Sequence, residues 1–199
     1  MEDMKEYLKP TYLCESDSIE IIKLAKEIVK NKKGENAAKA AYLWVRDNVS
    51  WNVLKIEGAK SVLERRPLEA VCIDKTNLFV ALCRAVGIPS RYILLDCVLK
   101  PKRKDLPPRT RHIAAEIFLN NKWIIADPDF GKTTEKIMPI NEFGKPCWSR
   151  VYNMKKVKDL SFFFVIIANL FLRFSKTSKI LKKAIEECKQ VQRSEHHPR

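Results

Sequence analysis

The most constraining stretch of the sequence is a predicted helix and strand that together span Leu68 to Arg91. Apolar side chains recur there at four-residue spacing, which indicates a core helix. These residues are Leu78, Leu82 and Val86. Gly87 is expected to end the helix, and a strand should follow over 90–95. Cys72 then lies at the helix start, where unpaired backbone N–H groups and the helix dipole favour a thiolate, the form that attacks acyl carbons.

The chain has three histidines, and two of them lie in a polar C-terminal tail, which leaves His112 as the candidate base. It opens a predicted β-hairpin over 112–126 that turns at Asn120-Asn121. In an antiparallel pair the start of one strand lies beside the end of the other, so His112 should meet Asp127. A thiol, an imidazole and a carboxylate so placed can act as nucleophile, base and orienting group.

Three segments follow one another in the chain: 37–53, a predicted helix and the residues after it; 71–91, which contains Cys72; and 112–128, which contains His112 and Asp127. Together they resemble the transglutaminase-like superfamily of cysteine enzymes, over about residues 20 to 130. The resemblance implies that Cys72 is the nucleophile, His112 the base and Asp127 the orienting group.

The sequence departs from the family's pattern at two places. Ala70 stands where the family usually has glycine, and Ile113-Ala114 where an aromatic residue usually follows the histidine. Both departures bear on the shape of the substrate cleft. Trp51 could donate its indole N–H to an oxyanion in that cleft, but a core tryptophan is the commoner role for such a residue.

The expected fold is α+β of the papain-like, transglutaminase-like kind, with a helical N-terminal part packed against an antiparallel sheet. The expected activity is cysteine-dependent acyl transfer on amide or peptide bonds of a protein or peptide substrate. Water is the default acceptor, giving a protease- or amidase-like enzyme, and transfer to an amine stays open. No cofactor or metal is expected. The alternative is a catalytically silent binding or scaffolding module with a basic C-terminal segment.

The six cysteines show no C-x-x-C spacing, so neither a zinc site nor a redox pair is indicated. They are Cys14, Cys72, Cys83, Cys97, Cys147 and Cys188. The charged N-terminal residues do not resemble a signal peptide, and reduced thiols in the cytoplasm are the simplest interpretation. We therefore expect no disulfide, and we expect Cys83 and Cys97 to be buried and inert.

The net charge of +14 indicates either attraction to an anionic partner, such as a membrane surface, nucleic acid or an acidic protein, or a basic surface that is only solvated. From Lys145 onward there are thirteen Lys and Arg against four Asp and Glu, an excess of nine. A second basic stretch, 96–111, ends beside His112 and should overhang the cleft, either to select acidic substrates or as a solvated connector. No specific nucleic-acid site is predicted.

The chain divides into a predicted catalytic domain, 1–159, and a C-terminal appendage, 160–199, that is apolar and then basic. The apolar run, Leu160 to Phe174, is too short to cross a bilayer. We expect an internal helix whose exposed stripe is Ser161, Asn169 and Arg173. Its inward side chains would be Phe162, Phe163, Ile166, Ile167 and Leu170. A helix lying in the membrane interface, making the protein peripheral to the membrane, is the alternative.

Overall fold

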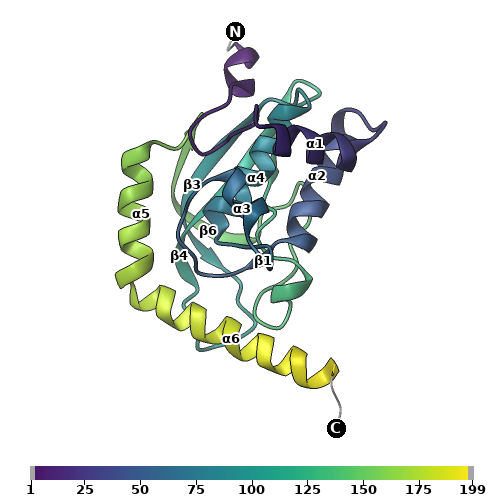
Figure 1. Cartoon of the computed structure of the whole chain (residues 1–199). Helices are drawn as coiled ribbons and strands as arrows, with labels where there is room; N and C mark the ends of the chain where they lie inside the picture. Colours follow the sequence, from purple (N-terminus) through teal and green to yellow (C-terminus); the bar gives the residue numbers. More distant parts are fainter. Residues whose placement is uncertain (1–2, 197–199) are drawn as a thin grey trace.

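A four-stranded antiparallel sheet, in the order β5-β4-β3-β6, is the frame of the molecule in the computed structural model (Figure 1). Its strands are β3 (Ser90–Leu99), β4 (Arg109–Leu119), β5 (Lys122–Ala126) and β6 (Trp148–Val157). The structure describes residues 3–196, without the side chains of Thr177, Cys188 and 191–196. A separate two-residue parallel pair joins β1 (Ser50–Trp51) to β2 (Glu69–Ala70).

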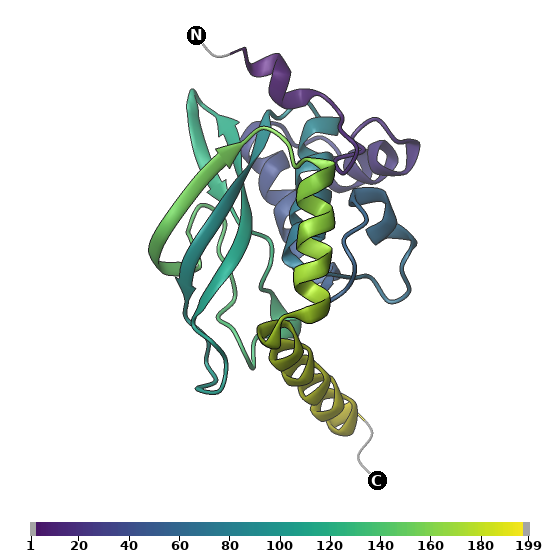
Figure 2. The ribbon, with the colours of Figure 1, turned by 90° about the vertical axis from the view of Figure 1, so that its left-hand side faces the viewer.

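Helices from the N-terminal half cover one face of this sheet (Figure 2). They are α1 (Ile19–Val29), α2 (Gly34–Asn48), α3 (Ala59–Glu64) and α4 (Cys72–Ala85), with short 3-10 turns η1 (Met4–Leu8) and η2 (Lys132–Thr134). α4 is the central helix, and every residue from Ile73 to Arg84 is buried. A helix enclosed on all sides has no solvent stripe, which explains why polar residues on it must find partners inside the protein. The predicted α+β arrangement is confirmed.

Arg84 shows how a buried charge on α4 is satisfied. Its guanidinium pairs with Asp159 at 2.9 Å and also donates to the backbone oxygens of Lys9, Ser90 and Lys158. These contacts join the N-terminal segment, the turn before β3 and the chain after β6 to the C-terminal end of the central helix.

The predicted hairpin is confirmed, with β4 and β5 joined at Asn120 and Asn121. Both residues have positive φ, 51° and 60°, as the two central positions of a type I′ turn require. The strand predicted over 90–95 is longer than expected and reaches Leu99. Its second half pairs with β4 on one side and β6 on the other, a long-range effect that the local pattern does not contain.

The C-terminal helices α5 (Phe162–Phe174) and α6 (Lys176–His196) follow, and the predicted orientation of α5 is wrong. Val165 is buried in the main core, and Asn169 faces inward. The side chains predicted to be buried are exposed: Phe162 by 56%, Phe163 by 77%, Ile166 by 42%, Ile167 by 64% and Leu170 by 52%.

The physical reason is a pair of hydrogen bonds. Asn169 accepts from Ile56 N at 2.8 Å and donates to Ile56 O at 3.2 Å. Ile56 lies in an irregular segment, so its backbone N–H and C=O have no partners in a helix or strand. The amide side chain of Asn169 supplies the hydrogen bonds that these two groups would otherwise lack. Ser161 and Arg173 are exposed, as predicted.

The division of the chain into a catalytic domain and an appendage at residue 159 stays a prediction. No helix among the described residues is long and apolar enough to cross a bilayer.

Five of the six cysteines are described, and all five are free thiols. Cys83 and Cys97 are fully buried, as predicted. The sixth is Cys188, whose side chain is not among those that the structure describes.

Two single substitutions on α5 test its observed orientation. Val165→Ala should lower the free energy of unfolding by about 1–2 kcal/mol, because it removes buried methyl groups. Phe163→Ala should change it by less than about 0.5 kcal/mol, because Phe163 is 77% exposed. Urea denaturation followed by circular dichroism measures both. A larger loss for Phe163→Ala than for Val165→Ala would show that the helix is turned the other way.

Candidate active site

Cys72 is the first residue of α4, and Val71 before it is extended. The first intrahelical bond at this end runs from Lys75 N to Val71 O, 3.0 Å. The backbone N–H groups in the turn before Lys75 therefore have no acceptor within the helix, and they lie at the end of α4 that carries Cys72. This is the geometry in which backbone donors can hold a developing oxyanion.

The start of α4 is fixed in place by the buried carboxylate of Asp74. It accepts from Gly58 N at 3.1 Å and pairs with the Arg65 guanidinium at 3.0 Å. Burial raises the pKa of Asp74, and Arg65 acts against this by favouring the charged form. The loop before α3 and the segment before β2 are thereby tied to the helix that carries Cys72.

His112 lies on β4, and the register of the hairpin explains its neighbours. Ala115 pairs with Ala126, so continuing both strands brings His112 beside residues 127–129. His112 Nε2 lies 2.8 Å from Asp127 Oδ2, with both side chains buried. The predicted meeting of this imidazole and this carboxylate is therefore observed.

Each member of the buried pair shifts the pKa of the other. Burial lowers the pKa of His112, but the adjacent Asp127 outweighs it and holds the pKa well above its usual range. Burial raises the pKa of Asp127, and His112 outweighs it in turn, so that the net shift is downward. The pair thus favours a positively charged ring beside a negatively charged carboxylate.

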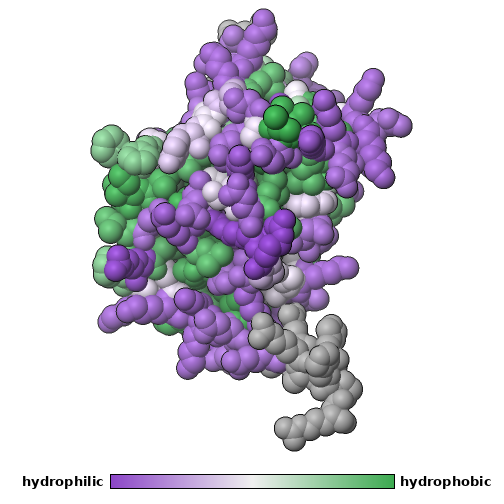
Figure 3. All heavy atoms as spheres, viewed as in Figure 1, coloured by the Kyte–Doolittle hydropathy of each residue, from purple (hydrophilic) through white to green (hydrophobic). Residues whose placement is uncertain are grey.

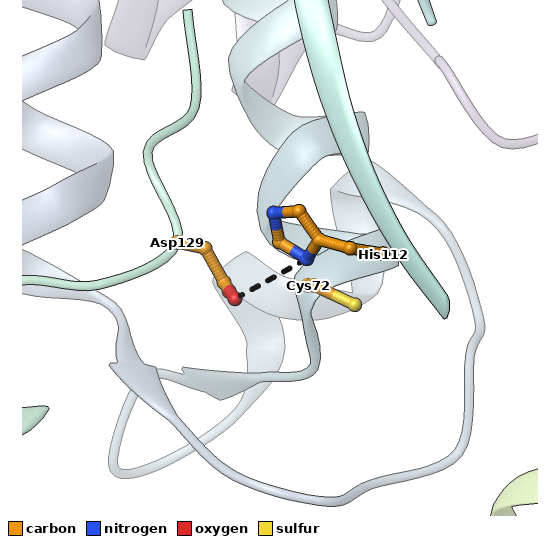
Figure 4. A group of neighbouring side chains, drawn as sticks. All are labelled: Cys72, His112 and Asp129. Carbon is orange, nitrogen blue, oxygen red and sulfur yellow. Dashed lines mark ion pairs between the residues drawn. The ribbon is translucent and has the colours of Figure 1, made fainter. Parts of the chain in front are cut away.

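The other ring nitrogen of His112 points to Cys72 and Asp129 (Figure 4). Nδ1 lies 3.9 Å from Asp129 Oδ2, and the thiol, ring nitrogen and carboxylate oxygen all lie within 4.8 Å of one another. Burial raises the pKa of the Cys72 thiol, whereas the His112 hydrogen bond lowers it. The predicted thiolate preference is therefore opposed by burial and depends on His112.

Asp129 is a site residue that the sequence reasoning missed. It is buried, and neither carboxylate oxygen has a hydrogen-bond partner among the described residues. Burial raises the pKa of Asp129 to about 7, with His112 acting in the opposite direction. The only signal in the sequence was its position two residues after Asp127.

Cys147 is the second missed residue and approaches the pair from the other side. Its thiol donates to Asp127 Oδ2 at 2.9 Å and lies 4.0 Å from His112 Nε2. Burial, followed by the charge of Asp127, raises the pKa of this thiol. Cys147 comes just before β6, far from the motif segments, so no local pattern indicated it.

Lys75 is a buried cation one turn after Cys72. Its ammonium donates to Val49 O at 2.6 Å and to Asp129 O at 2.7 Å. Burial lowers its pKa to about 8, while the charge of Asp129 acts in the opposite direction. Lys75 therefore ties the backbone of the Asp129 segment to α4.

A cavity of about 80 Å³ adjoins these residues. Its polar lining residues are Cys72, His112 and Asp129, together with Thr110, Arg111 and Ser178. Its apolar walls include Trp51, Phe130, Leu172 and Leu181. Trp51 is buried, and its indole N–H has no hydrogen-bond partner among the described residues. Both predicted roles of Trp51 are thus compatible with its place: it packs in a small core and its wall position faces the thiol's cavity.

The basic stretch before His112 borders the same cavity through the apolar residues Leu99, Pro101, Leu106 and Pro107, and through Thr110 and Arg111 next to His112. Arg103 instead forms ion pairs with Asp105, at 2.6 Å, and with Glu187 on α6, at 2.8 Å. Part of the charge of this stretch, which was expected either to select acidic substrates or to be solvated, is therefore used to hold the loop to the C-terminal helix.

Two trios in this site have side chains of the kind that bind metals. Cys72, His112 and Asp129 form one, and His112, Asp127 and Cys147 form the other. Both trios need the same imidazole, a group that can also serve as a general acid or base.

Comparisons with known proteins identify the family to which this chain belongs. Residues 22–128 match the sequence profile of the Transglutaminase-like superfamily, more than half of the chain. No curated protein sequence matches the chain.

The fold is similar to that of a "putative cysteine protease" from Cytophaga hutchinsonii, with 23% identity and a TM-score of 0.54. That match covers 79% of this chain and 55% of the other, so the chain spans about half the length of this relative. Red sea bream transglutaminase aligns at 13% identity over 62% of this chain and 27% of its own, with a TM-score of 0.41. The profile match includes the helix start at Cys72, the strand of His112 and the end of the hairpin at Asp127, and on it the chain belongs to the transglutaminase-like superfamily.

Proposed function

We propose that the protein is a cysteine-dependent acyl-transfer enzyme that hydrolyses an amide or peptide bond of a protein or peptide substrate. The observation that carries the proposal is the position of His112. One ring nitrogen lies 2.8 Å from Asp127, and the other faces the thiol at the start of α4. This is the arrangement in which a base can take a proton from a nucleophile while a carboxylate orients it.

In the proposed reaction the proton of the Cys72 thiol rests on His112 Nδ1, which makes the ring an imidazolium beside Asp127, and the thiolate sulfur attacks the substrate carbonyl carbon. The oxyanion is held by N–H groups at the start of α4, with the indole N–H of Trp51 as a further donor. His112 then gives the proton to the leaving amine, and a thioester remains. Water attacks the thioester with His112 as base, which releases a carboxylic acid and the free thiol.

Cys72 rather than Cys147 is the proposed nucleophile. Cys72 lies at the start of α4, where the first backbone N–H groups have no acceptor within the helix, whereas Cys147 already donates its proton to Asp127 at 2.9 Å. A thiolate at Cys147 would stand against that carboxylate, and this repulsion raises its pKa further.

A catalytically silent binding module is the second candidate, and one observation favours it. The cavity over Cys72, at about 80 Å³, is smaller than sites that bury small ligands, which are roughly 300 Å³ or more. Turnover of a peptide therefore requires the cavity to widen, by movement of the segments that line it, whereas a silent module has no such requirement.

A labelling experiment distinguishes Cys72 from Cys147 as the nucleophile. Cys72→Ala should reduce covalent labelling by an electrophilic acyl probe by at least about a thousandfold, because it removes the nucleophile. Cys147→Ser should keep labelling within about tenfold of wild type, because serine can still donate to Asp127. Intact-protein mass spectrometry measures both, with circular dichroism as the check that each variant folds.

Either of two results would contradict this assignment. Labelling that survives Cys72→Ala and disappears in Cys147→Ser would make Cys147 the nucleophile. Equal, slow labelling of wild type and both variants would support the silent module.

Asp129 should impose a pH dependence on the thiol. Its pKa of about 7 makes it anionic above neutral pH, and the anion raises the pKa of Cys72. Asp129→Asn removes that anion, so the rate of Cys72 alkylation by iodoacetamide should reach its half-maximum at lower pH than in wild type. Asp17→Asn, at an exposed position, is the matched control and should leave the curve unchanged. A shift to higher pH in Asp129→Asn would mean that Asp129 favours the thiolate.

A further inference from the structure

An open groove of about 650 Å³ lies outside the candidate active site, between the C-terminal helices and residues 53–55. Its apolar wall is formed by Val53, Leu54, Ile166, Leu170 and Leu172. The α5 side of the groove is fixed by the hydrogen bonds of Asn169 to Ile56, so its shape is part of the fold. An apolar groove of this size can accommodate a hydrocarbon chain.

Cations stand along the rim of the groove: Lys55, Arg173, Lys179 and Lys182. Lys55 is paired with Glu57 at 3.1 Å. No ion pair joins the other three to an acidic side chain among the described residues. An apolar wall with three uncompensated cations at its edge fits a ligand that is both apolar and anionic.

The groove continues into the exposed face of α5. Seven large apolar side chains follow one stripe of this helix, each 42–77% exposed: Phe162, Phe163, Ile166, Ile167, Leu170, Phe171 and Phe174. Figure 3 shows apolar side chains gathered over α5. Tyr12 extends this face, 70% exposed and in edge contact with Phe162 at 5.8 Å between ring centroids.

We infer that this face of α5 and the adjoining groove bind the surface of an anionic membrane. The phenylalanine and isoleucine side chains enter the acyl region, the helix lies parallel to the surface, and the three cations meet lipid phosphates. Lipid acyl chains match Ile and Leu side chains, whereas a polyanion such as nucleic acid offers them no apolar partner. A second copy of the chain would bring two sets of uncompensated cations together, against the net charge of +14 on each.

Vesicle co-sedimentation of the full-length protein tests the inference. The protein should bind vesicles of equal parts phosphatidylcholine and phosphatidylglycerol, bind phosphatidylcholine alone at least about tenfold more weakly, and lose binding as salt increases. Lys179→Glu/Lys182→Glu should weaken anionic-vesicle binding by at least about tenfold, because two of the three free cations are reversed. Phe163→Ala/Ile167→Ala should weaken it to a similar extent by removing inserted apolar surface.

The matched control is Lys23→Glu/Lys26→Glu on α1. It makes the same change in net charge at exposed positions away from the C-terminal helices, and it should bind within about twofold of wild type (Figure 1). Equal weakening by this control would mean that overall charge alone drives binding and would overturn the inference. So would equal binding to both vesicle types.

Self-association is the competing occupant of the α5 face. A concentration-dependent dimer in analytical ultracentrifugation that Phe163→Ala/Ile167→Ala disperses, without binding to anionic vesicles, would assign the face to a second copy and overturn the inference. Cys72→Ala should bind vesicles as wild type does, so the membrane surface and the proposed acyl transfer fail independently of each other.

Discussion

The site depends on one buried interaction, the 2.8 Å contact between His112 and Asp127. Burying an unpaired imidazolium or carboxylate is costly, so each group is tolerated only because the other is there. Asp127 fixes the ring through Nε2 and leaves Nδ1 for the thiol. Everything else in the site follows that orientation: Cys72 and Asp129 lie on the Nδ1 side and Cys147 on the Nε2 side.

Rigid elements hold the partners of this pair in place. α4, buried over nearly its whole length, carries Cys72 at its start, and the hairpin β4–β5 carries the imidazole and the carboxylate. Buried polar side chains tie the two together, Lys75 to the Asp129 backbone and Asp74 to the loop before α3. α5 packs one face on the core, and Leu172 on that helix lines the Cys72 cavity. Its other face is exposed to solvent. The proposed membrane surface therefore adjoins the proposed active site, because Phe171 of the exposed apolar stripe also lines the Cys72 cavity.

Local patterns were sufficient for the parts of this arrangement that neighbours in sequence determine. The four-residue spacing of Leu78, Leu82 and Val86 indicated α4, and Asn120-Asn121 fixed the hairpin register that brings His112 to Asp127. Contacts between distant segments were not predictable. Cys147 reaches Asp127 from the loop before β6, and Asn169 turned α5 over by bonding to Ile56, 113 residues away. Hydrophobicity could not rank the α5 faces because both are apolar: Phe164, Val165, Ala168 and Leu172 pack on the core side, and Asn169 bonds to Ile56 from that side.

The central claim is that Asp127 holds the imidazole through Nε2 and leaves Nδ1 to exchange its proton with Cys72. Nitrogen-15 NMR of His112 across a pH titration tests this most directly, with the His112 signals identified by their loss in His112→Asn. We expect Nε2 to keep its proton throughout and Nδ1 alone to lose its proton as the pH rises through the elevated pKa of the ring. Loss of the proton from Nε2, with Nδ1 remaining protonated, would contradict it.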